Sequence, residues 1–259
     1  MIRAVGLEKD YGEKRVLRGL DFELERGGFL VVTGANGSGK TTLLRIVAGV
    51  LRPLSGGVLV DGRPIDQMTR REVARRVAIV PQETHTTFDF SVIDIVLMGR
   101  YPHLGPLELE GVADQEIARE ALAATGTAAL ETRAFATLSG GEKQRVVIAS
   151  ALAQASEMLL LDEPTAALDL AYQFEIAALL RRLNAQRGTT MIVSTHDLNL
   201  AAALCERIVL LKEGRVLAYG STKETLTAAN IRELYDVDAD VQFHARAGHL
   251  TVVPIARAQ

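Results

Sequence analysis

Short apolar runs alternate along most of the chain with longer stretches in which apolar residues recur at helical spacing. This alternation of strand-like and helix-like patterns is typical of an α/β domain built on a largely parallel sheet. The clearest of these patterns predict strands at Met158–Leu161 and Thr190–Ser194, and helices at Gly39–Val50 and Ala171–Arg187.

Two regions depart from that alternation. Residues 1–34 contain three strand-like runs separated by turn residues, which predicts an antiparallel β region before the first helix. These runs are Ile2–Leu7, Val16–Leu24 and Phe29–Thr33. Residues 83–155 contain helical patterns and no comparable strand, so we expect a helical insertion there. Its predicted helices are Val92–Met98, Gln115–Thr125 and Glu142–Gln154.

The C-terminal part returns to strands. Glu213-Gly214 separates the apolar runs Arg207–Lys212 and Arg215–Tyr219, which predicts a hairpin. Residues 236–259 then predict a small strand-like extension. With 259 residues and 48% hydrophobic content, the chain has enough apolar material for one large core, so we expect a single domain over residues 1–259.

Charge and composition narrow the functional classes. The formal net charge is −3, whereas domains that bind nucleic acid usually carry a basic excess, so no nucleic-acid partner is expected. The basic cluster Arg70, Arg71, Arg75 and Arg76 follows a capping-box pattern and indicates a helix with a solvated face.

No apolar run approaches the roughly 18 residues of a membrane helix, and no export signal is expected. The single cysteine, Cys205, has the helical spacing of a core residue.

The sequence Gly34-Ala-Asn-Gly-Ser-Gly39-Lys40-Thr41 matches the phosphate-binding P-loop pattern, between an apolar strand and an amphipathic helix. Its glycines let backbone N–H groups approach a phosphate, Lys40 would reach the β- and γ-phosphates, and Thr41 would offer a hydroxyl to Mg²⁺. A glycine-rich turn is the alternative, but the strand and helix around it favour a nucleotide site. The predicted nucleotide contacts are Gly34, Asn36, Gly37, Ser38, Gly39, Lys40, Thr41 and Thr42.

Asp162 and Glu163 follow the apolar run Met158–Leu161 and would lie at the carboxyl edge of the predicted sheet. Asp162 would belong to the Mg²⁺ coordination sphere, directly or through water, and Glu163 would orient or deprotonate the attacking water. An acidic pair that ends a strand is by itself more often a helix cap or a surface turn. Together with a P-loop, it favours a site for nucleotide hydrolysis.

The motif that discriminates among P-loop proteins is Leu138-Ser139-Gly140-Gly141-Glu142, with Lys143-Gln-Arg145 behind it. It resembles the signature of ABC ATPases, and the family's other elements follow in order over residues 1 to about 225. These elements are Tyr11, Pro81-Gln82, Asp162-Glu163, Ala167-Leu168-Asp169 and His196. The resemblance implies an ABC ATPase fold: a RecA-like, mostly parallel sheet core with an N-terminal antiparallel β region and a helical insertion. Glu142 departs from the family, which most often has Gln there.

The resemblance also implies a role for each matching residue. Tyr11 would stack on adenine. Gln82 would sense Mg²⁺ and link the site to a membrane partner, and His196 would contact the γ-phosphate. Asp169 would lie at a dimer seam, where the signature of one copy contacts the ATP held by the P-loop of the other, so a single chain cannot complete its own site. The implied signature contacts are Ser139, Gly140, Gly141 and Glu142.

Within that family, the run Ser91–Gly105, the Glu142 variant and the tail Val237–Pro254 resemble the metal-chelate importers. That implies an ATPase that uses ATP and Mg²⁺ to energise uptake of an iron–siderophore complex, haem or cobalamin. The implied partners are a second copy arranged head to tail, integral membrane permease subunits and, indirectly, an extracytoplasmic substrate-binding protein. The implied location is peripheral, on the cytoplasmic face of the cell membrane.

Other functions stay open. The chain could serve an importer of a different substrate, or be an ABC-type clamp acting on nucleic acid or another protein complex. Such clamps carry a long coiled coil, tandem cassettes or zinc cysteines, and the sequence has none of these. A P-loop phosphotransferase is a further alternative, but it would need neither the signature motif nor His196.

Apolar residues just after Gln82 predict a coupling surface. We expect about half of them to pack inside the helical insertion and the rest to line a cleft for a short cytoplasmic helix of the permease. They are Phe88, Phe90, Val92, Ile95, Met98 and Tyr101.

Overall fold

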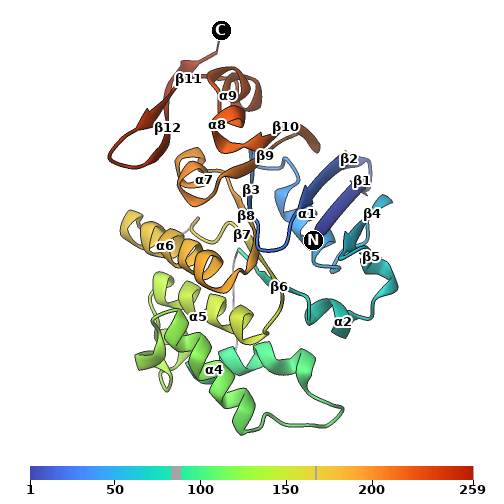
Figure 1. Ribbon diagram of the computed structural model, residues 1–259, viewed down its shortest axis with the longest axis vertical. Coiled ribbons are helices and arrows are strands. Elements are labelled where there is room, and N and C mark those ends of the chain that lie inside the picture. The colour runs from blue at the N-terminus through green and yellow to red at the C-terminus, as the bar shows by residue number, and fades with distance from the viewer. Residues whose placement is uncertain (83–88, 167, 259) are drawn as a thin grey trace.

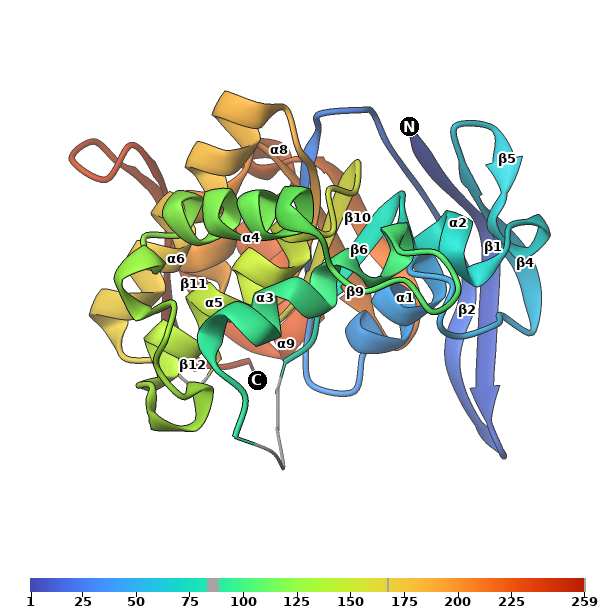
Figure 2. The ribbon, with the colours of Figure 1, turned by 90° about the horizontal axis from the view of Figure 1, so that it is seen from below.

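The computed structural model describes residues 1–82, 89–166 and 168–258 (Figure 1). Within these residues the strands form a six-stranded, a four-stranded and a two-stranded sheet. In the described part of the chain no helix is both long and apolar enough to cross a membrane. Figure 2 shows the helices α4, α5 and α6 gathered on one side and the strands β1, β2 and β4 on the opposite side.

The six-stranded sheet has the order β10-β9-β3-β8-β7-β6, and every neighbouring pair except β9–β10 is parallel. Its strands are β3 (Phe29–Thr33), β6 (Val77–Val80), β7 (Met158–Asp162), β8 (Thr190–Thr195), β9 (Arg207–Lys212) and β10 (Arg215–Ser221). The placement of Phe29–Thr33 in the antiparallel region was therefore wrong. Its continuous apolar run suits a strand covered on both faces, which is typical of a parallel sheet.

Alternate residues of the central strands face two separate hydrophobic cores. In β3, Leu30 and Val32 pack with α1 residues, whereas Val31 packs with residues of α5, α6 and α7. The helices with residues in these two cores are α1 (Lys40–Val47), α5 (Gly140–Ala153), α6 (Leu170–Arg187) and α7 (Leu198–Leu204). The parallel α/β core expected from the sequence is confirmed.

The four-stranded sheet is antiparallel, with the order β2-β1-β4-β5. Its strands are β1 (Ile2–Tyr11), β2 (Lys14–Leu24), β4 (Ser55–Val60) and β5 (Arg63–Pro64). The pattern of apolar residues did not predict β4, β5 or β6. Strand β4 begins with Ser55-Gly-Gly, and glycine is depleted in strands, so pairing with β1 rather than local preference makes this segment a strand. Helix α2 (Arg70–Ala74) follows, with the expected capping box.

The region after the described part of the Gln82 loop is helical, as predicted. It contains α3 (Val92–Leu97) and α4 (Val112–Ala124), both packed on α5. Short 3₁₀ helices in its described residues are Met98–His103, Ala128–Leu130 and Phe135–Thr137, and another, Ile65–Gln67, precedes α2. This part of the chain forms one hydrophobic core together with the side of the sheet that α6 and α7 cover.

The chain ends in α8 (Thr222–Thr225), α9 (Ala228–Tyr235) and the antiparallel pair β11 (Val237–His244) and β12 (His249–Arg257). The strand-like pattern of the tail is thus a hairpin, which lies beside α9 and α7 (Figure 1).

Cys205 follows the last residue of α7 instead of lying within a helix, and its thiol contacts the Arg207 backbone oxygen at 2.9 Å. Burial raises the pKa of this thiol to about 12, so it stays protonated.

Candidate nucleotide site

The P-loop connects β3 to α1 in a conformation that requires glycine. A side chain at Gly34 would lie 2.1 Å from the Leu211 backbone oxygen, and Gly39 has a φ of 110°. Gly39 is also the N-cap of α1 and provides no side-chain hydrogen bond to the first turn. Because the first N–H groups of a helix have no partner within it, the start of α1 offers donors and a partial positive charge to an anion.

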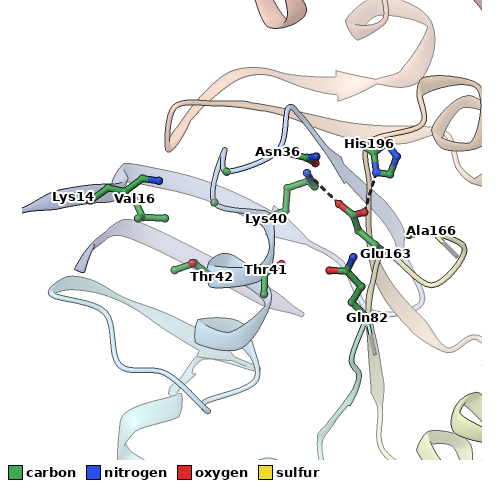
Figure 3. A pocket seen from close by; sticks show the side chains of 12 residues that line it. Lys14, Val16, Asn36, Lys40, Thr41, Thr42, Gln82, Glu163, Ala166 and His196 are labelled. Atoms are coloured by element: carbon green, nitrogen blue, oxygen red, sulfur yellow. Dashed lines mark hydrogen bonds and ion pairs between the residues drawn. The ribbon is translucent and has the colours of Figure 1, made fainter. Parts of the chain in front are cut away.

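A cavity of about 500 Å³ opens in front of this loop (Figure 3). It lies between the P-loop, the start of β2 and the ends of β6, β7 and β8. The lining residues are Lys14, Val16, Asn36, Gly37, Gly39, Lys40, Thr41, Thr42, Gln82, Glu163, Ala166 and His196. A volume of this size suits a small organic ligand.

Lys40 is folded back onto its own loop. Its Nζ donates to the backbone oxygens of Gly34 and Ala35, at 2.9 and 3.3 Å, and forms an ion pair with Glu163 Oε1 at 3.3 Å. The Lys40 side chain is only 5% exposed, so these contacts bury its charged group. A phosphate that binds to Lys40 would therefore replace contacts that its Nζ makes with Gly34, Ala35 and Glu163.

Glu163 lines the cavity and lies between Lys40 and His196 (Figure 3). Its Oε2 is 2.8 Å from His196 Nδ1, while its Oε1 faces Lys40. The backbone has a φ of 46°, a left-handed conformation that costs a non-glycine residue free energy and often occurs at functional sites. Two hydrogen bonds from the Glu163 N–H, to Ser194 O at 3.1 Å and Ser194 Oγ at 3.0 Å, hold this conformation.

The neighbouring Asp162 is 4% exposed and does not belong to the residues lining the cavity. Its Oδ1 accepts a hydrogen bond of 2.7 Å from Ser194 Oγ. The two acids therefore differ in environment: Glu163 reaches into the cavity, whereas Asp162 is buried behind it. Ser194 bonds to both residues and fixes their relative position.

The structure brings many of the predicted site residues into one cavity, namely Asn36, Gly37, Gly39, Lys40, Thr41, Thr42, Gln82, Glu163 and His196. Gly34 and Ser38 belong to the same loop without lining the cavity, and Tyr11 does not line it either, although it lies at the end of β1 and is 48% exposed. The sequence did not predict Lys14, Val16 and Ala166. The place of Lys14 and Val16 just after Tyr11 was the available signal.

The signature residues also lie outside the cavity. Ser139 begins α5 with a capping box: its backbone N–H donates to Glu142 Oε2 at 2.8 Å, and the Glu142 N–H bonds to Ser139 Oγ at 3.4 Å. The hydrogen bonds from the Ser139 backbone and hydroxyl lower the pKa of Glu142. The capping box thus fixes the geometry of the first turn of α5.

The beginning of α5 packs against the beginning of α6. The Tyr172 ring is so close to Gly141 that a side chain there would lie 2.5 Å from it, and Leu168 lies against Gly140. Asp169, the N-cap of α6, makes no side-chain hydrogen bond to that helix. The signature residues and Asp169 therefore lie on one surface, which is separate from the cavity lined by Lys40 and Glu163.

We predict that Glu142→Gln preserves this cap, because an amide oxygen can accept the same hydrogen bonds. A carboxylate with a lowered pKa stabilises the fold above its unfolded-state pKa, and the stabilisation is lost as pH falls through the folded value. Glutamine lacks this charge, so the variant should melt slightly below the wild type at pH 7, by about 2 °C in Tm, and the difference should disappear as the pH falls. Thermal melts from pH 7 to pH 3 measure both. A variant with an unchanged pH profile would contradict the prediction.

A P-loop before a helix, a carboxylate at the end of a neighbouring parallel strand and a separate glycine-containing helix start together define a P-loop nucleotide hydrolase. The profile of the family described as "ABC transporter" matches residues 17–166. The chain belongs to this family, as one of its ATP-binding, ATP-hydrolysing domains.

Relatives and solved structures agree with that assignment. The hemin import ATP-binding protein of Gloeobacter violaceus is 42% identical, over 100% of this chain and 95% of its own length. The ferric enterobactin transport ATP-binding protein of Escherichia coli is 37% identical, over 99% and 94%. A transporter described as of the metal-chelate type, in an inward-facing conformation, matches with a TM-score of 0.87 and 31% identity, over 99% of this chain and 98% of that one.

A further structural match bears on assembly. An ATP-binding cassette solved as a dimer in a post-hydrolysis state, with ADP and Pi, matches with a TM-score of 0.75 and 29% identity, over 86% of this chain and 99% of its own. ABC ATPase cassettes form dimers, and the import subunits among them work with membrane permeases.

Proposed function

We propose that this chain hydrolyses ATP as a head-to-tail dimer and thereby drives uptake of a metal chelate through a separate membrane permease. The observation that carries the hydrolytic part is the position of Glu163. Its two carboxylate oxygens contact a phosphate-binding lysine and a histidine at the wall of the same cavity. This arrangement suits a general base for water beside a γ-phosphate.

In the proposed reaction, the P-loop N–H groups and Lys40 hold the β- and γ-phosphates and oppose the negative charge that the transition state distributes over their oxygens. Glu163 orients the attacking water and accepts its proton. His196 contacts the γ-phosphate and keeps Glu163 directed into the cavity through Nδ1. Tyr11 stacks on the adenine, next to the cavity wall formed by Lys14 and Val16.

The residues present fit a bound Mg²⁺. The described residues contain no cluster of three His, Cys, Asp or Glu side chains that could hold a metal alone. Mg²⁺ in nucleotide enzymes commonly takes only one or two protein oxygens, together with phosphates and waters. Thr41 and Gln82 would supply a hydroxyl and an amide oxygen from the cavity wall, and Asp162 a carboxylate behind it. The ion would neutralise charge on the phosphate oxygens.

The position of the signature supports a site shared between two chains. Ser139, Gly140, Gly141 and Glu142 belong to a preformed helix start outside their own cavity, and Asp169 lies on the same surface. In a head-to-tail dimer this surface would close over the nucleotide held by the P-loop of the other copy.

The choice of a metal chelate rests on the named relatives, which import hemin and ferric enterobactin. The same resemblance supports an iron–siderophore complex, haem or cobalamin as substrate, an extracytoplasmic substrate-binding protein, and a peripheral position on the cytoplasmic face of the membrane. The structure offers a candidate surface for the permease. Of the predicted coupling residues, Met98 and Tyr101 are 47% and 71% exposed.

Three other predicted coupling residues pack inside the molecule. Val92 and Ile95 are buried in the helical core, and Phe90 is partly buried against it. Ser91 and Asp94 form a capping box at the start of α3. Phe88 lies outside the described residues. The proposed coupling surface is therefore Met98 and Tyr101, at the end of α3 and in the 3₁₀ helix after it.

We predict that Met98→Asp and Tyr101→Asp leave ATP binding by the isolated chain unchanged but abolish capture of the permease, because an apolar joint does not accommodate an unpaired charge. Affinity purification of the tagged chain from detergent-solubilised membranes, with hemin and ferric-siderophore uptake in cells, measures this. Phe243→Asp, at an equally exposed position on the C-terminal hairpin, is the matched control. Normal capture and uptake by both coupling variants would place the permease contact elsewhere.

A further inference from the structure

The C-terminal part of the chain contacts the segment after β8 at two separate points. Tyr235, the last residue of α9, donates a long hydrogen bond of 3.4 Å to the His196 backbone oxygen. Asn199, three residues after His196 in the first turn of α7, bonds to Val252 in β12. One contact is therefore made to the histidine itself and the other to the helix that follows it, and neither α9 nor β12 lines the nucleotide cavity.

The contact between Asn199 and β12 uses both backbone groups of one residue. The Val252 N–H donates to Asn199 Oδ1 at 2.7 Å, and Asn199 Nδ2 donates to the Val252 oxygen at 3.1 Å. Val252 is in register with Val241 of β11, so Asn199 binds the other edge of the two-stranded sheet. An edge strand leaves such groups unpaired, and a side-chain amide that binds both fixes the strand to α7.

Hydrophobic packing holds the hairpin in place for this contact. Val252 and Ala239, one from each strand, are 4% and 8% exposed and belong to the same hydrophobic core as Leu200 and Ala201 of α7. Leu234 of α9 belongs to it as well. Figure 1 shows β12 beside α7. The hairpin is thus packed on the helix that His196 precedes, instead of projecting freely from the domain.

Hydrogen bonds at both ends and one peptide bond between Asp197 and His196 connect β12 to Glu163. Asp197, the N-cap of α7, accepts the N–H groups of Asn199 at 2.8 Å and Leu200 at 3.0 Å. His196 directly precedes this cap, and its Nδ1 is 2.8 Å from Glu163 Oε2. At the other contact, burial raises the pKa of Tyr235, so its hydroxyl stays protonated and remains a donor to the His196 oxygen.

We infer that α9 and the C-terminal hairpin position His196. Tyr235 and Asn199 hold the backbone at and just after this histidine, so that its side chain stays directed at Glu163 and the nucleotide. The inference rests on the proposed role of His196 in hydrolysis. Asn199 and Tyr235 are positioning residues, because both act on His196 from outside the cavity.

The first test is Asn199→Ala. We expect kcat for ATP hydrolysis to fall about three- to tenfold, the effect of losing one or two hydrogen bonds that order a catalytic group. ATP affinity should stay unchanged, because the P-loop is not touched. Tyr235→Phe should lower kcat less, since its bond is long. Thr251→Ala, which removes a hydrogen bond inside the hairpin, is the control and should retain the wild-type rate.

The second test separates positioning from general destabilisation. Asn199→Ala is combined with His196→Ala, and kcat is measured for both singles and the double. If Asn199 acts through His196, the double variant hydrolyses ATP at the rate of His196→Ala alone. An equal additional loss in both backgrounds, or a wild-type rate for both Asn199→Ala and Tyr235→Phe, overturns the inference. A wild-type rate for His196→Ala instead overturns the role proposed for His196 itself, and the inference with it.

Discussion

Glu163→Gln is expected to bind ATP normally but hydrolyse it about 10²–10⁴ times more slowly, the range for loss of a general base. Glutamine keeps the size of the side chain and its hydrogen-bonding capacity, so it can still contact Lys40 and His196. It cannot take a proton from water. With hydrolysis slowed, ATP should hold two copies together, and size-exclusion chromatography with Mg²⁺ and ATP should show a dimer that the wild type does not accumulate.

The control for this variant is Glu157→Gln. Glu157 directly precedes the same strand at its opposite end and pairs with Arg26 and Arg76, away from the nucleotide cavity. We expect wild-type turnover from it. Near-normal hydrolysis by Glu163→Gln would remove the role of Glu163 as base. Slow hydrolysis without a dimer would leave the base in place and contradict the shared site.

Lys40→Ala should weaken ATP binding about a hundredfold or more, because two charge-assisted hydrogen bonds to phosphate are lost at about 1.5 kcal/mol each. The change also removes the hydrogen bonds that the buried Lys40 donates to Gly34 and Ala35, and its ion pair with Glu163. The domain should still fold, because Lys40 belongs to neither hydrophobic core. Titration calorimetry with ATP and a thermal melt measure the two effects separately.

Lys14→Ala is the matched control for Lys40. Lys14 also lines the cavity, but it is exposed and lies at the β2 end, away from Glu163 (Figure 3). Its loss should change ATP affinity less than tenfold, as expected for a solvated charge. ATP affinity that is unchanged in a folded Lys40→Ala variant would contradict the assignment of the P-loop.

Some of the site could be predicted because its chemistry is local in sequence. The P-loop needs a strand, glycines, a lysine and a helix in direct succession, and the signature needs a serine, two glycines and an acid at a helix start. Phi angles, caps and first-turn geometry follow from neighbouring residues, so the chain itself specified Lys40 and the Ser139 cap. The carboxylates after an apolar run were readable for the same reason.

Other features depended on contacts between distant segments. A five-residue apolar run such as Phe29–Thr33 has no local property that decides between an antiparallel and a parallel partner, and pairing with β8 and β9 decided it. The exposure of Met98 beside buried Ile95, and the burial of Lys40, likewise depend on what packs against each side chain.

By itself, the sequence determined the class of protein and most of the chemical groups at its site, because those motifs are contiguous and their residue types are chemically specific. Only the tertiary structure decided that Lys14 and Val16 line the cavity and that Asn199 binds β12 close to His196. Each of these is set by long-range packing and hydrogen bonding, whose free energy comes from segments that are far apart along the chain.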